Sequence, residues 1–194
     1  MKKLPKIILH HSKLLEPFFN FYVQNCPDVK GKGWKEWVPP DAEKMEKRIS
    51  AYRNIWAKYE EKVLNGICSA LGLSFDRDLI DVFIVAGINR SMSNPVIIGS
   101  QYLPNNFIIT LTHELIHLIF RGTNFKFRKI LLIRGKNSVV DNHILVYAIL
   151  RKIFKEEPKI LKVVADIKYD KDYKKAYELS RPYEKILKFF RENK

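Results

Sequence analysis

The chain has 194 residues, of which 46% are hydrophobic and 29% are charged, and its formal net charge is +14. These values fit a globular protein with a core of its own, and no apolar run reaches the ~18–20 residues needed to span a bilayer. The positive charge attracts anionic partners, but lysine and arginine are spread along the chain without an arginine-rich tail, so nucleic acid is not the favoured partner. The start of the chain lacks a small-residue cleavage site, so we expect a cytoplasmic protein.

The first 75 residues are predicted to form a helical N-terminal segment. Residues 12–25 are expected to form a short helix with Ser12 as its N-cap, and after a Gly- and Pro-containing loop Asp41 caps a long helix. Gly72 lies where this helix should end. Apolar residues recur every three or four positions, as on one buried helical face, at Met45, Ile49, Tyr52, Trp56, Tyr59, Val63 and Ile67.

Two β-rich runs follow, IDVFIVAG at residues 80–87 and PVIIGSQY at residues 95–102, and both are predicted to be strands. A helix capped by Asn105 or Asn106 should then run to Arg121 and be buried, because it is apolar almost all round. Residues 125–134 fit a strand or a helix equally well.

The C-terminal part is predicted to be helical. One helix should cover residues 138–154 and stop before Pro158, and residues 160–194 should be helical with a break near Pro182. We therefore expect an α+β fold, in which a small β-sheet packs on the buried helix between helical N- and C-terminal segments. Residues 1–75 and 76–194 would form an N-terminal segment and a core within one compact unit.

Three polar residues interrupt the buried helix. His113 and His117 are four positions apart, so on a helix their side chains lie one turn apart on the same face. Two imidazoles so placed can bind one metal ion, and neutral imidazole suits zinc. Glu114 lies about 100° round the helix, where it can take a proton from a metal-bound water. The alternative is that both histidines are ordinary core residues and that Glu114 forms a salt bridge.

A catalytic zinc site needs a third protein ligand and leaves its fourth position to water. His143 is the first candidate, because it is another polar residue in an apolar stretch, VVDNHILVYAIL. Asp141, two residues earlier, is the rival ligand. A remote residue, including His10 or His11, also stays open.

The five residues from His113 to His117 and the later run from Asn142 to Tyr147 resemble the zincin metallopeptidases, and within them the gluzincin branch. In that branch a second helix carries Asn-Glu-x-x-x-Asp, with the Glu as third ligand. Here Asn142 matches, His143 stands in the place of the Glu, and Tyr147 replaces the Asp. The resemblance implies a zincin-like fold, a bound Zn²⁺, a peptide or protein substrate, and an edge strand that pairs with it, for which residues 95–102 are the candidate.

We therefore expect a hydrolase, a zinc metallopeptidase that cleaves peptide bonds by a zinc-activated water with Glu114 as general base. Tyr147, one turn after His143, is the first candidate to donate to the developing oxyanion, and Arg134 and Tyr102 are weaker ones. Two other functions stay open: a basic, nucleic-acid-associated binding protein that keeps zinc for structure, and a zinc hydrolase of another amide. Glu114 favours an enzyme, because a structural zinc site needs no base.

Overall fold

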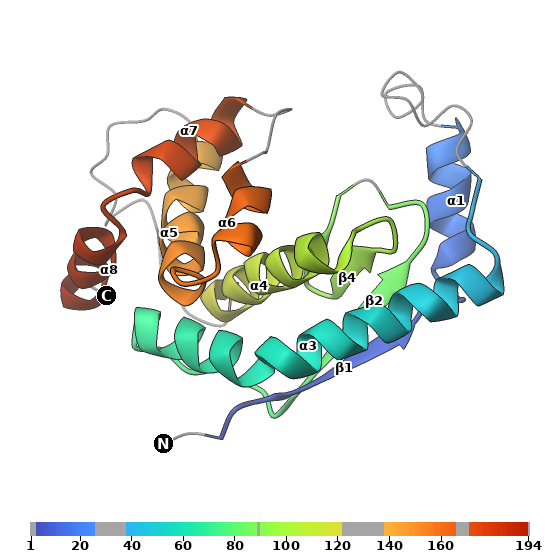
Figure 1. The fold of residues 1–194 in the computed structure, drawn as a ribbon, viewed down its shortest axis with the longest axis horizontal. Helices are drawn as coiled ribbons and strands as arrows, with labels where there is room; N and C mark the ends of the chain where they lie inside the picture. The colour runs from blue at the N-terminus through green and yellow to red at the C-terminus, as the bar shows by residue number, and fades with distance from the viewer. Residues whose placement is uncertain (1–2, 26–37, 89, 122–137, 166–170, 194) are drawn as a thin grey trace. The chain divides into compact units, whose positions relative to one another are not determined.

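The computed structural model of the chain describes residues 3–25, 38–88, 90–121, 138–165 and 171–193. Within these residues the predicted α+β class is confirmed: seven helices accompany one four-stranded sheet (Figure 1). The zincin-like arrangement within that class stays a prediction. In chain order the elements are β1 (Lys6–His11), α1 (Glu16–Asn25), α3 (Ala42–Leu71), β2 (Leu79–Val85), β3 (Met92–Ser93), β4 (Val96–Gly99), α4 (Pro104–Arg121), α5 (Ser138–Ile153), α6 (Pro158–Ala165), α7 (Lys171–Leu179) and α8 (Tyr183–Asn193).

The chain divides into two compact units. We call Pro5–Lys58 with Arg77–Glu114 the sheet unit, and Met1–Leu4 with Tyr59–Asp76 and Leu115–Lys194 the helical unit. Helices α3 and α4 each contribute residues to both units. The predicted segments 1–75 and 76–194 each contribute residues to both units. Their division into an N-terminal segment and a core stays a prediction.

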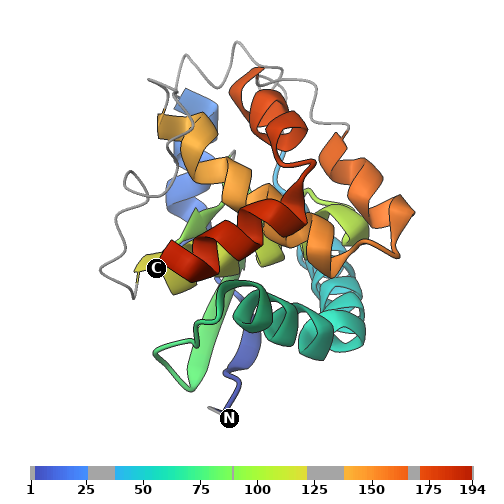
Figure 2. The ribbon, with the colours of Figure 1, turned by 90° about the vertical axis from the view of Figure 1, so that its left-hand side faces the viewer.

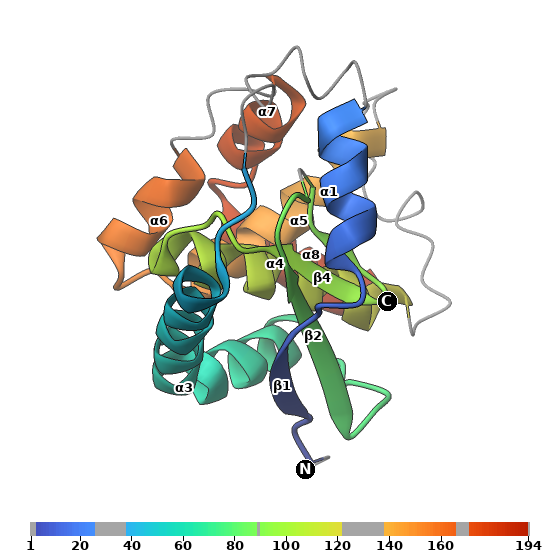
Figure 3. The ribbon, with the colours of Figure 1, turned by 90° about the vertical axis from the view of Figure 1, so that its right-hand side faces the viewer.

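The sheet has the strand order β1-β2-β4-β3, in which β1, β2 and β4 are parallel and β3 is antiparallel to β4. Figure 3 shows β1 and β2 running side by side. Successive side chains of a strand point to opposite faces of the sheet, and the pairing register of β1, β2 and β4 therefore places one set of Val, Ile and Leu side chains on the same face. All of them are buried: Ile7, Leu9, Ile80, Val82, Ile84, Val96 and Ile98. Such apolar strands are typical of parallel sheets that are covered by helices.

The opposite face of the sheet packs against α1. Val85 and Ile97 form a buried cluster with Ile88, against which Leu15, Phe19 and Phe83 pack. The turn after β2 approaches α1 closely at Gly87, whose φ is +81° and whose Cα faces Asn20. A side chain at Gly87 would place its Cβ only 2.8 Å from Asn20 Oδ1, so this approach requires glycine.

The prediction of a helix over residues 12–25 was wrong at its start. Residues 6–11 form β1, which we did not predict, and the backbone N–H of Ser12 donates to the carbonyl oxygen of Ile84 at 3.0 Å. The sheet thus takes the hydrogen bonds of this stretch, and α1 begins only at Glu16. The strand was missed because its pairing partner lies more than seventy residues away along the chain.

The strands predicted at residues 80–87 and 95–102 are confirmed as β2 and β4, with shorter bounds. The role of the second strand as a sheet edge is wrong, because β4 lies between β2 and β3. Met92 and Ser93 fold back antiparallel and pair with Ile97 and Val96. β3 therefore occupies the outer side of β4 at Val96 and Ile97, two of the positions at which a substrate was expected to pair.

The long helix α3 forms as predicted. The Asp41 carboxylate accepts a hydrogen bond from the backbone N–H of Lys44 at 2.8 Å, as an N-cap does, and Gly72 follows the helix with a φ of 62°. Every residue of the predicted apolar stripe is at most 5% exposed. Within the sheet unit the ring of Tyr52 stacks on Phe107 of α4, with ring centroids 4.0 Å apart, and its hydroxyl donates to the carbonyl oxygen of Tyr102 at 2.6 Å.

The prediction that Asn105 or Asn106 caps α4 was wrong, because the helix already begins at Pro104 and both asparagines lie within its first turn. Pro104 takes the first helical position, where a missing N–H costs nothing. In the helical unit α5 packs against both α7 and α8 (Figure 2). Pro158 starts α6, and the chain breaks between α7 and α8 near Pro182, as predicted. Residues 125–134 lie outside the described part of the chain. None of the helices in that part has the length and apolar character needed to cross a membrane.

Candidate metal centre

Helix α4 positions the first three residues of the site. Its side chains are buried over most of their surface, as its apolar sequence predicts, and Glu114 is itself only 8% exposed. His113 and His117 are half-buried and lie one turn apart on this single continuous helix. Their spacing follows from the helical repeat and needs no contact from elsewhere.

The third histidine comes from α5, where His143 is 8% exposed. Its Nδ1 lies 2.7 Å from the carbonyl oxygen of Val139, one turn earlier on the same helix. A carbonyl oxygen only accepts hydrogen bonds, so Nδ1 carries the proton and donates it. Nε2 therefore keeps the lone pair that can bind a metal ion, and the hydrogen bond fixes the orientation of the ring.

The structure brings His113, His117 and His143 together. One ring nitrogen from each histidine lies within 4.8 Å of the other two, and the rings of His117 and His143 meet edge to face with centroids 5.1 Å apart. Nitrogens that bind one zinc ion tetrahedrally at about 2.0–2.1 Å lie about 3.4 Å apart, so the three ring nitrogens are grouped near the spacing that a metal ion requires. Among the described residues this group could hold a metal ion, and it is a set of nitrogen ligands alone.

The rival ligands lie elsewhere. Asp141 does not belong to the cluster, and its buried Oδ1 has no hydrogen-bond partner in the described part of the chain. His10 and His11 lie on β1 in the sheet unit, where they contact Asp81 at 2.7 Å and Glu16 at 3.0 Å. The structure thus groups His143, and not Asp141, His10 or His11, with His113 and His117.

Burial favours the neutral form of His117. It lowers the pKa of His117 to about 4, and the neighbouring His143 and Arg121 act in the same direction. His117 is therefore neutral at neutral pH, and neutral imidazole is the form that binds metal ions.

Aromatic residues surround His143. Tyr147, the candidate oxyanion donor, is 1% exposed and its ring centroid lies 6.3 Å from that of His143. Tyr173 of α7 lies closer, at 4.3 Å, and was not singled out in the sequence. In the sequence it follows a stretch of acidic and basic residues far from the five residues 113–117, so no local pattern indicates a role for it. Tyr177, also on α7, meets the ring of Tyr147 edge to face at 5.6 Å.

Of the two weaker candidates for the oxyanion donor, Arg134 and Tyr102, the structure describes only Tyr102. Arg134 lies outside the described residues. Burial raises the pKa of Tyr102, and the negative charge of Glu114 raises it further. Tyr102 and Glu114 both belong to the sheet unit, and Tyr102 lies close enough for the charge of Glu114 to affect its pKa.

The centre thus combines three imidazoles that could hold a metal ion with a buried carboxylate next to one of them in the sequence. Three imidazole ligands can bind several divalent transition metals, and zinc is one of them. Comparison of the chain with protein-family models, with curated proteins and with solved structures found no match, so the functional argument depends on the geometry of the site.

Proposed function

We propose that the protein is a zinc-dependent metallopeptidase. The observation that carries the proposal is the convergence of His113, His117 and His143, with Glu114 beside the first of them on α4. A bound Zn²⁺ would supply a Lewis acid that polarises the scissile carbonyl and lowers the pKa of water to about 7.

The nature of the ligands supports an open site. Three protein ligands leave one position free for water and substrate, whereas structural zinc sites are closed by a fourth protein ligand, commonly a cysteine. No cysteine or carboxylate joins the three histidines among the described residues. The hydrogen bond from His143 Nδ1 to the carbonyl oxygen of Val139 supports the same ligand role, because it leaves the lone pair of the ring on Nε2.

Glu114 is the general base of the proposed reaction. A carboxylate next to a ligand can accept a proton from the attacking water and then return it to the leaving amine. Its 8% exposure keeps the group away from bulk water, where its charge would be screened. Tyr147 is the candidate to donate a hydrogen bond to the developing oxyanion.

Metal content tests the ligand set. Protein purified without chelators should hold about one zinc ion per chain by elemental analysis, and His143→Ala should lose most of it because two imidazoles hold zinc far more weakly than three. His10→Ala is the matched control, since His10 contacts Asp81 outside the cluster, and it should keep its zinc. A wild-type protein without zinc, or equal loss in both variants, would contradict the proposal.

Cleavage of a fluorogenic peptide library tests the reaction. Glu114→Gln should keep its zinc and lose activity by about 10²–10⁴-fold, the usual contribution of a general base. Glu43→Gln, which changes an exposed glutamate of α3 that pairs with Lys47, should cleave like the wild type. If Glu114→Gln cleaves as fast as wild type, or if zinc-loaded wild type cleaves nothing, the centre has a structural or other hydrolytic role instead.

A further inference from the structure

The positive charge of the chain is not spread evenly over the folded protein. Lysine and arginine outnumber aspartate and glutamate most strongly after residue 115, in the segment that supplies α5 to α8 of the helical unit. Charge alone does not make a binding site, since exposed lysines are mostly solvated. A binding site needs several cations around one cavity. Residues at the end of α5 and on α8 form such a cavity.

A cleft of about 460 Å³ lies between these two elements. Its volume falls within the range of small-molecule sites. Four of the residues around it are cations and a single one is a carboxylate. The lining residues are Lys152, Lys155, Tyr183, Glu184, Leu187, Lys188 and Arg191.

The cations of the cleft are poorly neutralised by the protein. Lys152 has no ion pair in the described part of the chain, and burial, together with the positive charge of Arg191, lowers its pKa. Among the described residues, Lys155 and Lys188 pair with exposed carboxylates, Glu156 at 3.6 Å and Glu192 at 3.9 Å. These contacts lie at the outer limit of an ion pair and are screened by water.

Arg191 completes the positive end of the cleft. Its Nη1 donates to the carbonyl oxygen of Ala70 at 3.3 Å, which anchors the side chain and leaves further N–H donors of the guanidinium for a ligand. A guanidinium binds the oxygens of a phosphate in pairs, and lysine ammonium groups add point charges. Tyr183 and Leu187 supply an aromatic and an apolar surface for a group attached to the phosphate.

We propose that this cleft binds a small phosphate ester that carries two or more phosphate groups. Four cations and one carboxylate line the cleft, and the further carboxylates beside Lys155 and Lys188 are exposed, so the cleft suits a ligand with several negative charges. Its volume suits a small molecule better than a polymer. The proposal concerns a site separate from the three histidines, and it goes beyond the proposed peptidase function.

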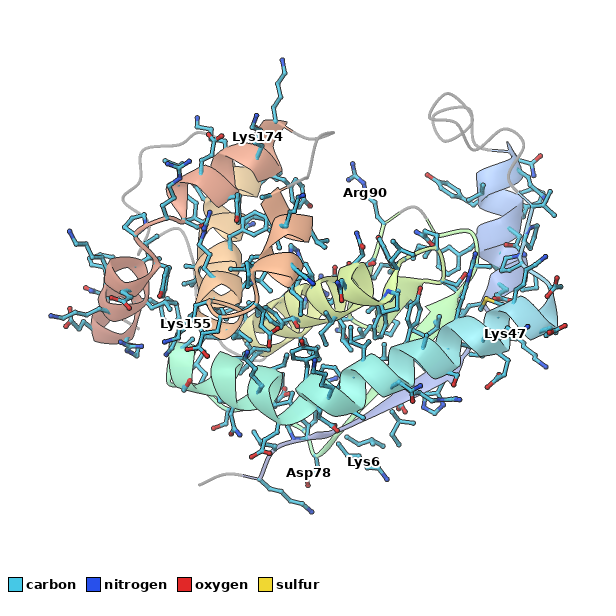
Figure 4. The ribbon with its side chains drawn as sticks, in the orientation of Figure 1. Lys6, Lys47, Asp78, Arg90, Lys155 and Lys174 are labelled. Carbon is cyan, nitrogen blue, oxygen red and sulfur yellow. The ribbon has the colours of Figure 1, made fainter. Side chains whose placement is uncertain are left out.

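Calorimetric titration of the full chain with inorganic tripolyphosphate tests the proposal. We expect saturable binding to one site that Lys155→Gln combined with Lys188→Gln weakens by about tenfold or more, as expected for the loss of charge-assisted contacts. Both lysines are exposed, at 60% and 73% of their side chains, so this variant should fold. The matched control is Lys159→Gln combined with Lys174→Gln, two exposed cations of α6 and α7 that do not line the cleft, and it should bind within about twofold of wild type. Figure 4 labels Lys155, which lines the cleft, and Lys174 on α7.

Three results would overturn the proposal. If both double variants bound tripolyphosphate equally weakly, the anion would be attracted by the overall positive charge of the protein and not by this cleft. Loss of binding in His143→Ala would mean that tripolyphosphate binds a metal at the histidine cluster instead. A single-stranded oligonucleotide that binds through Lys155 and Lys188 while tripolyphosphate does not bind would assign the surface to nucleic acid. None of these results bears on whether Glu114 supports peptide cleavage.

Discussion

The imidazole of His143 is oriented by its own helix and by its aromatic neighbours. The bond from Nδ1 to the carbonyl oxygen of Val139 sets the tautomer, and the ring of Tyr173, 4.3 Å away, limits the rotation of the imidazole. Because a ligand must be held in one orientation to bind a metal well, these contacts matter as much as the presence of the histidine. Both contacts come from α5 and α7, outside the five residues 113–117 of α4.

A change at Tyr147 tests the proposed oxyanion donor. Tyr147→Phe should lower kcat for peptide cleavage by about 10²–10³-fold with little change in KM or zinc content, because the hydroxyl would act only in the transition state. Tyr177→Phe is the matched control, since it keeps the ring that packs on Tyr147 and on Arg151. Equal activity of Tyr147→Phe and wild type would leave Tyr147 as a packing residue.

At the scale of elements, α3 and α5 approach each other closely in the helical unit. Gly66 of α3 faces Ile153 of α5, and a Cβ at residue 66 would lie 2.6 Å from Ile153 Cγ1. Isoleucine is branched at Cβ and therefore has little rotamer freedom on a helix. The close approach explains why a glycine stands inside a long helix, where alanine would otherwise be favoured by about 1 kcal/mol.

Gly66→Ala should therefore destabilise the protein by about 1–3 kcal/mol despite the better helix propensity of alanine. In an Ile153→Ala background the same change should be neutral or stabilising, because the obstructing Cγ1 is gone. A double-mutant cycle by urea denaturation measures this coupling. Stabilisation by Gly66→Ala in the wild-type background would show that the two helices can move apart freely.

The N-cap of α3 predicts a dependence of stability on pH. The hydrogen bond from the Lys44 backbone N–H, followed by the Lys44 side chain, lowers the pKa of Asp41 below its ordinary value of 3.8. A carboxyl whose pKa is lower in the folded chain stabilises it above the unfolded pKa, and this contribution is lost as the pH falls through the folded pKa. Asp41→Asn keeps an acceptor for the cap but has no charge.

Wild type should therefore melt at a higher temperature than Asp41→Asn at neutral pH, and the difference should close as the pH falls below 3.8. Thermal melts over a pH series measure the difference, with Asp41→Ala as the variant that loses the cap at every pH. A gap that persists unchanged in acid would mean that the charge of Asp41 does not contribute.

At the scale of the whole molecule, neither compact unit is continuous in sequence. In the sheet unit β1 from the first segment pairs along its full length with β2 from a later one, from Lys6 with Leu79 to His11 with Ile84. A parallel pair of this kind needs a long connection, and here α3 lies within it. The stability of the sheet thus depends on residues from both predicted segments.

A fragment of residues 76–194 should consequently fail to fold cooperatively, because β2 would lose its partner β1 and expose the apolar face of the sheet. Circular dichroism and denaturant titration of the fragment check this, and the mixture with residues 1–75 should regain a cooperative transition. An isolated fragment that unfolds cooperatively and binds zinc would show instead that 76–194 is a core in its own right.

The sequence by itself determined the features that depend on local geometry. The 3.6-residue repeat places His113 and His117 on one face of α4, and the same repeat makes the stripe of α3 a buried one. Caps and breakers such as Asp41 and Gly72 act within a few residues of their own position. These features follow from backbone hydrogen bonding and are therefore readable without knowing where the rest of the chain lies.

The tertiary structure alone decided what depends on distant partners. It brings His143, and not Asp141 or His10, to His113 and His117, places Tyr173 against the ring of His143, and pairs β1 with β2. It also gathers the lysines of α5 and α8 around one cleft. No local pattern contains these contacts, because each is set by the packing of elements far apart in the chain, where the gain from burying apolar surface chooses the neighbours.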